Sequence, residues 1–175
     1  LASRVQEFLG AFPAVAILGP RQCGKSTLAK KLLAGYPDAL YLDLERDSDL
    51  RKLTEPELFF AAHRDELVCL DEIQRRPELF PVLRSILDDV GRPGQVLLLG
   101  SASPELIRQS SETLAGRIGY LELSPLLLGE LEERGDVSPE SHWLRGGFPR
   151  SLLSTSDEMS FEWRLQFIRT FIERD

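Results

Sequence analysis

Residues 19–26 read Gly19-Pro20-Arg21-Gln22-Cys23-Gly24-Lys25-Ser26, and they fit the pattern G-x-x-x-x-G-K-[ST] at every fixed position. The apolar run 14–18 before them predicts a buried strand, and the run 25–33 predicts a helix. Glycine lets the backbone of such a loop approach a polyphosphate closely, while loop amides and the helix N-terminus attract its negative charge. The stretch therefore predicts a phosphate-binding loop between a strand and a helix.

The loop also predicts which side chains touch a bound nucleotide. Lys25 is expected to reach the β- and γ-phosphates, and the Ser26 hydroxyl is expected to bind Mg²⁺. The full set of expected nucleotide contacts is Gly19, Pro20, Arg21, Gln22, Cys23, Gly24, Lys25, Ser26 and Thr27. A glycine-rich turn with an exposed lysine is the alternative, which the strand and the helix around the loop disfavour.

Another predicted strand ends in two acids. Residues 67–70 are apolar, and Asp71 and Glu72 follow them directly. In P-loop nucleotide hydrolases an aspartate at such a strand end supports the Mg²⁺ shell. An adjacent glutamate can accept the proton of the attacking water as a general base. Asp71 is therefore the predicted metal residue alongside Ser26, and Glu72 is the predicted catalytic base, with an ordinary acidic loop as the alternative.

A further strand end carries hydroxyl groups. The apolar run 95–99 leads into Gly100, and Ser101 and Ser103 follow. A small hydroxyl at this place can sense the γ-phosphate or orient the attacking water. Ser101 is the preferred catalytic candidate and Ser103 the second, and an ordinary serine-containing loop is the alternative.

The apolar pattern of the whole chain indicates a parallel sheet that is covered by helices on both faces. Strands are expected at residues 14–18, 39–44, 67–71, 95–99 and 118–123, and helices at 1–9, 25–33, 77–89 and from 157 onward. Continuously apolar strands that are separated by helical stretches are typical of α/β folds.

The composition of the chain excludes several classes of protein. The chain has 175 residues, of which 42% are hydrophobic and 28% charged, as in a folded soluble protein. Its net charge of −7 argues against a protein that binds nucleic acid over its whole surface. A local basic groove is still compatible with this charge. No apolar stretch reaches the roughly 18–20 residues of a membrane-spanning helix. The two cysteines, Cys23 and Cys69, form no disulfide framework, which predicts a cytoplasmic location.

Several strings together resemble the AAA+ branch of the P-loop ATPases. They are Gly19-Pro20-Arg21-Gln22, Leu70-Asp71-Glu72-Ile73-Gln74, Leu99-Gly100-Ser101-Ala102-Ser103, Leu114-Ala115-Gly116-Arg117-Ile118 and Gly146-Gly147-Phe148-Pro149. Within that branch they look like a group of poorly characterised prokaryotic ATPases. In that group an AAA+ module precedes a C-terminal region that includes a nuclease-like domain of unknown function, and residues 167–175 resemble the junction that leads into it.

The resemblance implies an architecture and a pair of ligands. It implies a P-loop NTPase sheet of five parallel strands in the order 5-1-4-3-2, with ATP as the nucleotide and Mg²⁺ as the metal. It also implies an ATPase core at residues 1–130 and a helical extension at 131–175 that leads to a C-terminal domain outside this sequence. The chain has no initiator Met, and no Gly or Pro follows its last predicted helix, which predicts that the native chain continues.

An arginine is expected to complete the site. Arg117 is the candidate, because an inserted guanidinium stabilises charge on the γ-phosphate oxygens and Gly116 allows a close turn before it. It is expected to act either within its own subunit or from a neighbouring copy, and the second case requires self-association. A surface ion pair is the alternative role for Arg117, and Arg145 and Arg150 are the next candidates.

The sequence therefore predicts an ATPase, in which Mg²⁺-dependent binding and hydrolysis of ATP drive or gate a C-terminal effector domain. Two other functions stay open. One is a nucleotide-dependent switch that hydrolyses ATP slowly and acts by interaction with a partner. The other is a P-loop kinase for a small molecule, which is weaker because residues 106–117 contain only Arg108 and Arg117 where an arginine-rich lid is expected.

Overall fold

The computed structural model describes residues 1–132 and 137–171. The chain divides into two units. The first comprises residues 1–19 and 25–123 and holds the sheet, and the second comprises residues 20–24 and the chain from Ser124 onward. The predicted boundary between residues 130 and 131 falls inside the helix α7 (Leu128–Glu132).

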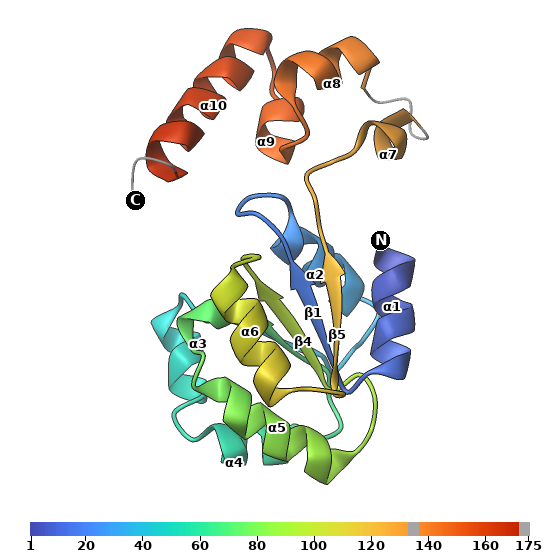
Figure 1. Ribbon diagram of the computed structural model, residues 1–175, viewed down its shortest axis with the longest axis vertical. Coiled ribbons are helices and arrows are strands. Elements are labelled where there is room, and N and C mark those ends of the chain that lie inside the picture. Colours follow the sequence, from blue (N-terminus) through green and yellow to red (C-terminus); the bar gives the residue numbers. More distant parts are fainter. Residues whose placement is uncertain (133–136, 172–175) are drawn as a thin grey trace. The chain divides into compact units, whose positions relative to one another are not determined.

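The first unit is built on a parallel sheet of five strands (Figure 1). The strands are β1 (Ala14–Leu18), β2 (Leu40–Asp43), β3 (Val68–Asp71), β4 (Val96–Gly100) and β5 (Ile118–Glu122). Their order across the sheet is β2-β3-β4-β1-β5, and every neighbouring pair is parallel. The predicted order 5-1-4-3-2 and the α/β class are therefore confirmed.

The register of the strands aligns their carboxyl ends. Leu18 at the end of β1 lies opposite Gly100 of β4 and Glu122 of β5, and Asp43 of β2 lies opposite Asp71 of β3. Because parallel strands point the same way, the segments that follow them emerge at one edge of the sheet, where ligands bind in open α/β folds.

Alternate residues of each strand face two different helical layers. On one face of the sheet lie α1 (Ala2–Ala11) and α2 (Lys25–Leu33). The buried side chains of this layer are Val5, Leu9, Val15, Ile17, Ala29, Leu32, Leu67, Cys69, Leu97, Leu99 and Leu121. Val5 and Leu9 are four residues apart, which places them on one face of α1. This face packs against the sheet.

The other face is covered by four helices (Figure 1). They are α3 (Asp47–Lys52), α4 (Pro56–Ala62), α5 (Leu79–Val90) and α6 (Pro104–Thr113). The buried side chains that these helices and their ends contribute are Leu53, Phe60, Leu79, Phe80, Leu83, Leu87, Leu106 and Leu114. α5 ends at Gly91, whose φ of 65° is a conformation that glycine adopts without strain.

The helices α3, α4 and α6 were not predicted from the sequence. α3 and α4 have six and seven residues, which is too short for a 3.6-residue period to stand out. α6 is mostly polar and buries only Leu106 and Ser110. A sequence feature that indicates the start of α4 and of α6 is the proline in the first turn of each, because proline is common at the first position of a helix.

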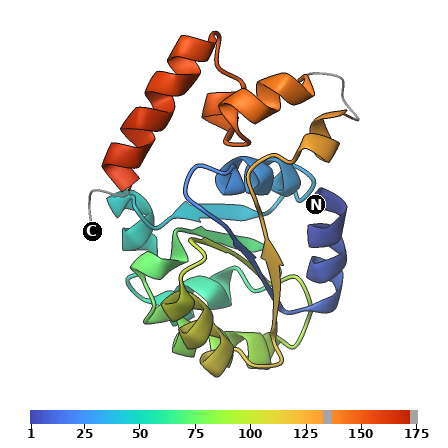
Figure 2. The same ribbon diagram turned by 45° about the horizontal axis from the view of Figure 1, so that its top comes forward.

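From Ser124 onward, the regular elements of the described residues are all helices. Besides α7 the second unit contains α8 (Pro139–Arg145), α9 (Pro149–Leu152) and α10 (Asp157–Phe171). Figure 2 shows α8, α9 and α10 side by side. The buried hydroxyls of Ser151 and Ser160 are 2.8 Å apart and join α9 to α10. None of the helices that the structure describes combines the length and the apolar character needed to cross a bilayer.

Candidate functional site

The phosphate-binding loop leaves β1 at Leu18 and enters α2 at Lys25. Gln22 and Gly24 have positive φ angles, of 63° and 109°. A Cβ atom at position 24 would meet no atom within 4 Å, so it is the backbone angle alone that favours glycine there. Left-handed residues in a turn that runs into a helix N-terminus are the backbone features of an anion-binding nest.

Lys25 is the first residue of α2 and its side chain is buried, with 5% of the residue exposed. Its Nζ donates a hydrogen bond to the carbonyl oxygen of Gly19 over 2.9 Å. A buried ammonium group needs polar partners, because removing a charge from water without them costs several kcal/mol. The contact folds the lysine side chain back along the loop, so its positive charge lies beside the backbone that is predicted to receive a polyphosphate.

Asp71 ends β3 and is 3% exposed. One carboxylate oxygen, Oδ1, accepts a hydrogen bond from the backbone N–H of Glu72 over 2.9 Å. The other, Oδ2, accepts a short hydrogen bond from the hydroxyl of Tyr41. Both oxygens of the predicted metal residue are therefore held in fixed directions.

Tyr41 belongs to the candidate site and was not predicted from the sequence. It lies on β2, and its hydroxyl donates a hydrogen bond to the Asp71 carboxylate and lies near the side chain of Ser26. Burial, together with the neighbouring Asp71 carboxylate, raises the pKa of the Tyr41 hydroxyl above its usual range. The ammonium of Lys30 lies 4.7 Å from the centre of the tyrosine ring. Tyr41 thus holds one of the two residues that were predicted to bind the metal, Asp71, and lies near the other, Ser26.

Glu72 follows Asp71 in a left-handed backbone conformation, with a φ of 59°. Its side chain is half-buried, and its carboxylate accepts a hydrogen bond from the Nε2 of Gln74. Gln74 lies in the 3-10 turn η1 (Ile73–Arg75), and its Oε1 accepts a hydrogen bond from the backbone N–H of Ser101 over 3.3 Å. Glu72 and Ser101, at the ends of β3 and β4, are therefore bridged by a side chain that was not among the predicted site residues.

The structure distinguishes the two serines that follow β4. The hydroxyl of Ser103 accepts a hydrogen bond from the backbone N–H of Leu106 over 3.2 Å, so Ser103 is the N-cap of α6. Ser101 lies two residues closer to the strand, and its backbone N–H is the group that contacts Gln74. Ser103 therefore has a structural role as a helix cap, whereas the Ser101 hydroxyl makes no hydrogen bond within the described part of the chain.

The remaining predicted nucleotide contacts lie in the loop or in the first turn of α2. Cys23 is buried, Ser26 is half-buried, and Arg21 and Thr27 are exposed. Gly19, Lys25, Asp71, Glu72 and Ser101 all lie at the carboxyl edge of the sheet, because each of them ends a parallel strand, follows one or begins the helix after one.

The structure does not bring Arg117 to this edge of the sheet. Arg117 directly precedes β5, and its carbonyl oxygen accepts a hydrogen bond from Ala14, the first residue of β1. Its Nη2 donates to Asp88 over 2.9 Å and its Nη1 donates to the carbonyl oxygen of Ala115 over 2.8 Å. Arg117 therefore occupies the amino edge of its own sheet in an ion pair, and the alternative of action on a neighbouring copy stays a prediction.

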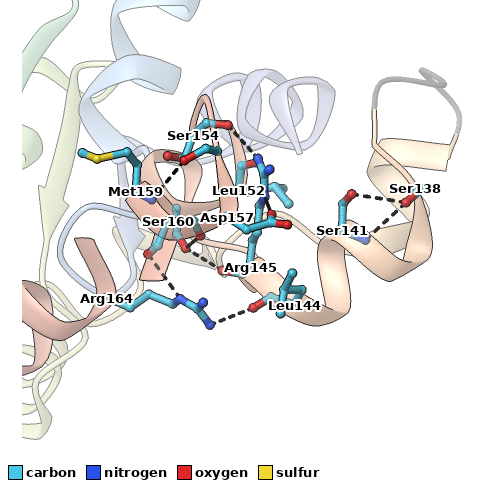
Figure 3. A network of polar contacts seen from close by, with 12 residues as sticks. Ser138, Ser141, Leu144, Arg145, Leu152, Ser154, Asp157, Met159, Ser160 and Arg164 are labelled. Atoms are coloured by element: carbon cyan, nitrogen blue, oxygen red, sulfur yellow. Dashed lines mark hydrogen bonds and ion pairs between the residues drawn. The ribbon is translucent and has the colours of Figure 1, made fainter. Parts of the chain in front are cut away.

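The next arginine candidates lie in the second unit. Arg145 is at the end of α8, where its Nε donates to Asp157 over 2.7 Å and its Nη1 donates to the carbonyl oxygen of Ser154 over 2.6 Å (Figure 3). These contacts tie α8 to the start of α10, which is a structural role. Arg150 is exposed on α9.

Comparison with known proteins defines the class. A family model described as an AAA domain matches residues 11–132, which span the five strands and their covering helices except α1. The chain belongs to this AAA domain family, and its sheet and loop are those of an AAA-type P-loop ATPase domain.

Two curated relatives share the sequence over most of this chain. They are the uncharacterized protein Mb2031c of Mycobacterium bovis and the uncharacterized protein Rv2008c of Mycobacterium tuberculosis, each 41% identical over 174 residues. The match covers 99% of this chain and 38% of each relative. The chain therefore spans less than half the length of the curated relatives it matches.

Solved structures share the fold. The Walker-type ATPase paby2304 of Pyrococcus abyssi is similar with a TM-score of 0.66 and 17% identity, over 98% of this chain and 72% of that chain. The signal transduction ATPase PH0952 of Pyrococcus horikoshii, which carries a tetratricopeptide repeat sensor, has a TM-score of 0.53 and 15% identity. That match covers 95% of this chain and 32% of the other, and at these identities the likeness is one of fold.

The contacts of Tyr41 lead to a prediction about stability. Tyr41→Phe removes the hydroxyl and leaves the buried Oδ2 of Asp71 without its donor, so the free energy of unfolding should fall by about 1–3 kcal/mol. Urea unfolding measures this change. Tyr36→Phe is the matched control, because Tyr36 is half-buried and its hydroxyl makes no hydrogen bond among the described residues. Equal unfolding midpoints for the two variants would contradict the prediction.

Proposed function

We propose that this chain binds ATP together with Mg²⁺ and hydrolyses it. The observation that carries the proposal is the meeting of two groups at one edge of a parallel sheet. The loop with the buried Lys25 follows β1, and the acids Asp71 and Glu72 end β3. A cationic loop suits a polyphosphate, and a carboxylate pair beside it suits hydrolysis of the terminal phosphate.

The oxygen groups around Tyr41 fit a magnesium ion. Mg²⁺ in nucleotide sites takes one or two protein oxygens and completes its shell with phosphate oxygens and water. The Ser26 hydroxyl and the Asp71 carboxylate are such oxygens; the carboxylate accepts a hydrogen bond from Tyr41, and Ser26 lies near the same tyrosine hydroxyl. Ser26 and Asp71 would therefore hold the ion, which supplies positive charge to the phosphate oxygens when bound.

Three other residues would take part in the reaction. Lys25 balances charge on the β- and γ-phosphates, and Glu72 accepts the proton of the attacking water. The Ser101 hydroxyl contacts the γ-phosphate or orients the water. These roles need a bound nucleotide at the loop, and each is supported by the position of the residue at the carboxyl edge of the sheet.

Hydrolysis is proposed to drive or gate a further domain. Support comes from the relatives, of which this chain matches 38%. A small-molecule kinase is disfavoured by α6, because Leu106 and Leu114 at its two ends are buried in the core. That segment covers the sheet and so does not serve as the lid that a kinase requires.

The first test removes the lysine charge. Lys25→Ala should abolish binding of Mg·ATP in a folded chain, because the contact to the β- and γ-phosphates is lost. Isothermal calorimetry measures the affinity, and circular dichroism checks the fold. Lys31→Ala, which changes an exposed lysine on the same helix, should bind like the unchanged protein. Wild-type affinity in a folded Lys25→Ala chain would refute the assignment of the loop.

The second test separates binding from hydrolysis. Glu72→Gln should keep the ATP affinity and lower turnover by about 10²- to 10⁴-fold, since an amide cannot accept the water proton. Phosphate release at saturating ATP measures turnover. The control is Glu45→Gln, which changes an exposed acid that pairs with Arg75. Turnover of Glu72→Gln at the wild-type rate would assign water activation to another residue.

A third test concerns Arg117 and self-association. If Arg117 completes the site of a neighbouring copy, the specific activity should rise with protein concentration. Arg117→Ala should abolish that rise and lower turnover by about 10³- to 10⁵-fold while ATP affinity is kept. Arg108→Ala, which changes an exposed arginine on α6, is the control. Activity that is independent of concentration and of Arg117 would leave its ion pair with Asp88 as its role.

A further inference from the structure

The amide of Gln74 connects the ends of two strands. Its Nε2 donates to the carboxylate of Glu72 after β3, and its Oε1 accepts from the backbone N–H of Ser101 after β4. The residues at the two ends of this bridge are the proposed general base and the proposed γ-phosphate sensor. Gln74 therefore lies in the physical path between the two groups that must be aligned on the same phosphate.

The chemistry of its two partners determines how the amide is oriented. A carboxylate only accepts hydrogen bonds, and a backbone N–H only donates. Only the arrangement with Nε2 toward Glu72 and Oε1 toward Ser101 satisfies both partners. Exchange of the two amide ends would break both contacts at once, so Gln74 has a single productive orientation.

The fold leaves room for this amide at Gly100. A Cβ atom on Gly100 would lie 2.9 Å from the Oε1 of Gln74 and 2.7 Å from the Cδ2 of Leu106, which are closer approaches than such atoms tolerate. The carbonyl oxygen of Gly100 also accepts a hydrogen bond from the backbone N–H of Gly19, the first residue of the phosphate-binding loop, over 3.3 Å. Gly100, beside which the Gln74 amide lies, is therefore hydrogen-bonded to the first residue of the phosphate-binding loop.

The backbone of Glu72 is restrained in the same turn. Its φ of 59° is uncommon for a residue with a side chain. Its carbonyl oxygen accepts a hydrogen bond from the backbone N–H of Arg75 over 2.9 Å, which closes the η1 turn. With the backbone held by the turn and the carboxylate held by Gln74, the direction of the Glu72 side chain is defined at both ends.

We propose that Gln74 is a positioning residue, which holds the Glu72 carboxylate in register with the end of β4 that presents Ser101. This inference rests on the proposed function, because it concerns the same hydrolysis step. Gln74 acts through Glu72. A displacement of the Ser101 backbone relative to β3 is transmitted through the amide to the carboxylate, so contact with the γ-phosphate and activation of water are coupled.

The kinetic test uses a nearly isosteric change. Gln74→Glu keeps an acceptor for the Ser101 N–H but replaces the donor to Glu72 with a second carboxylate. Turnover should fall by about 10- to 10²-fold, the scale of a misplaced catalytic group, while the affinity for Mg·ATP stays within about 2-fold of wild type. Gln109→Glu makes the same change on α6, where Gln109 contacts Glu105, and should leave both quantities unchanged.

A second measurement does not depend on activity. Gln74→Glu places two carboxylates together, so its urea unfolding midpoint should lie below that of wild type. In the double variant Glu72→Gln/Gln74→Glu the amide and the carboxylate are exchanged, and the hydrogen bond can form in the reverse direction. The midpoint of the double variant should therefore recover toward that of wild type. Two additive losses would show that the two side chains do not interact and would overturn the proposal.

The outcomes separate this inference from the proposed function. Absence of ATP turnover in the wild-type chain, or wild-type turnover in Glu72→Gln, would refute the proposed function. If wild type hydrolyses ATP and Glu72→Gln does not, then wild-type or raised turnover in Gln74→Glu would overturn the positioning role alone. A lowered turnover with kept affinity, together with the recovered midpoint of the double variant, supports it.

Discussion

Parallel pairing of β1 with β4 is the constraint on which the candidate site depends. The two strands are in register from Ala14 and Val96 to Leu18 and Gly100, and the N–H of Gly19 continues this ladder to the carbonyl oxygen of Gly100. The first residue of the phosphate-binding loop is thereby tied to the turn after β4. A slip of one residue would turn the side chains of β1 to the opposite layer and move the loop by about 3.3 Å.

The candidate site also contains two buried charged residues. Lys25 and Asp71 are 5% and 3% exposed, and groups of this kind are retained in a fold only when polar partners replace water. Gly19 supplies a partner for the ammonium, and Tyr41 and the Glu72 N–H supply partners for the carboxylate. Among the described residues, no buried side-chain nitrogen or oxygen lacks a hydrogen bond. Substitutions at this edge therefore change the geometry of the sheet end as well as its charge.

Much of this arrangement could be predicted because it depends on local sequence. The loop is a continuous motif, and apolar runs that end in acids or serines mark the strands. Tyr41 and Gln74 could not be found in this way, because their partners Asp71 and Ser101 are 30 and 27 residues away and meet them only through sheet pairing. The position of Arg117 could have been predicted. A residue just before a predicted parallel strand lies at the amino edge of the sheet, and the phosphate-binding loop follows the carboxyl end of its strand.

The central claim is hydrolysis of ATP at the edge where the loop and the acids meet. Its most direct test is a single-turnover experiment with the wild-type chain in excess over γ-labelled ATP, with Mg²⁺ and with the metal chelated. We predict that ADP and inorganic phosphate form in equal amounts and that chelation abolishes the reaction. Bound ATP that stays intact in the presence of Mg²⁺, or label that appears on an acceptor other than water, would contradict the account.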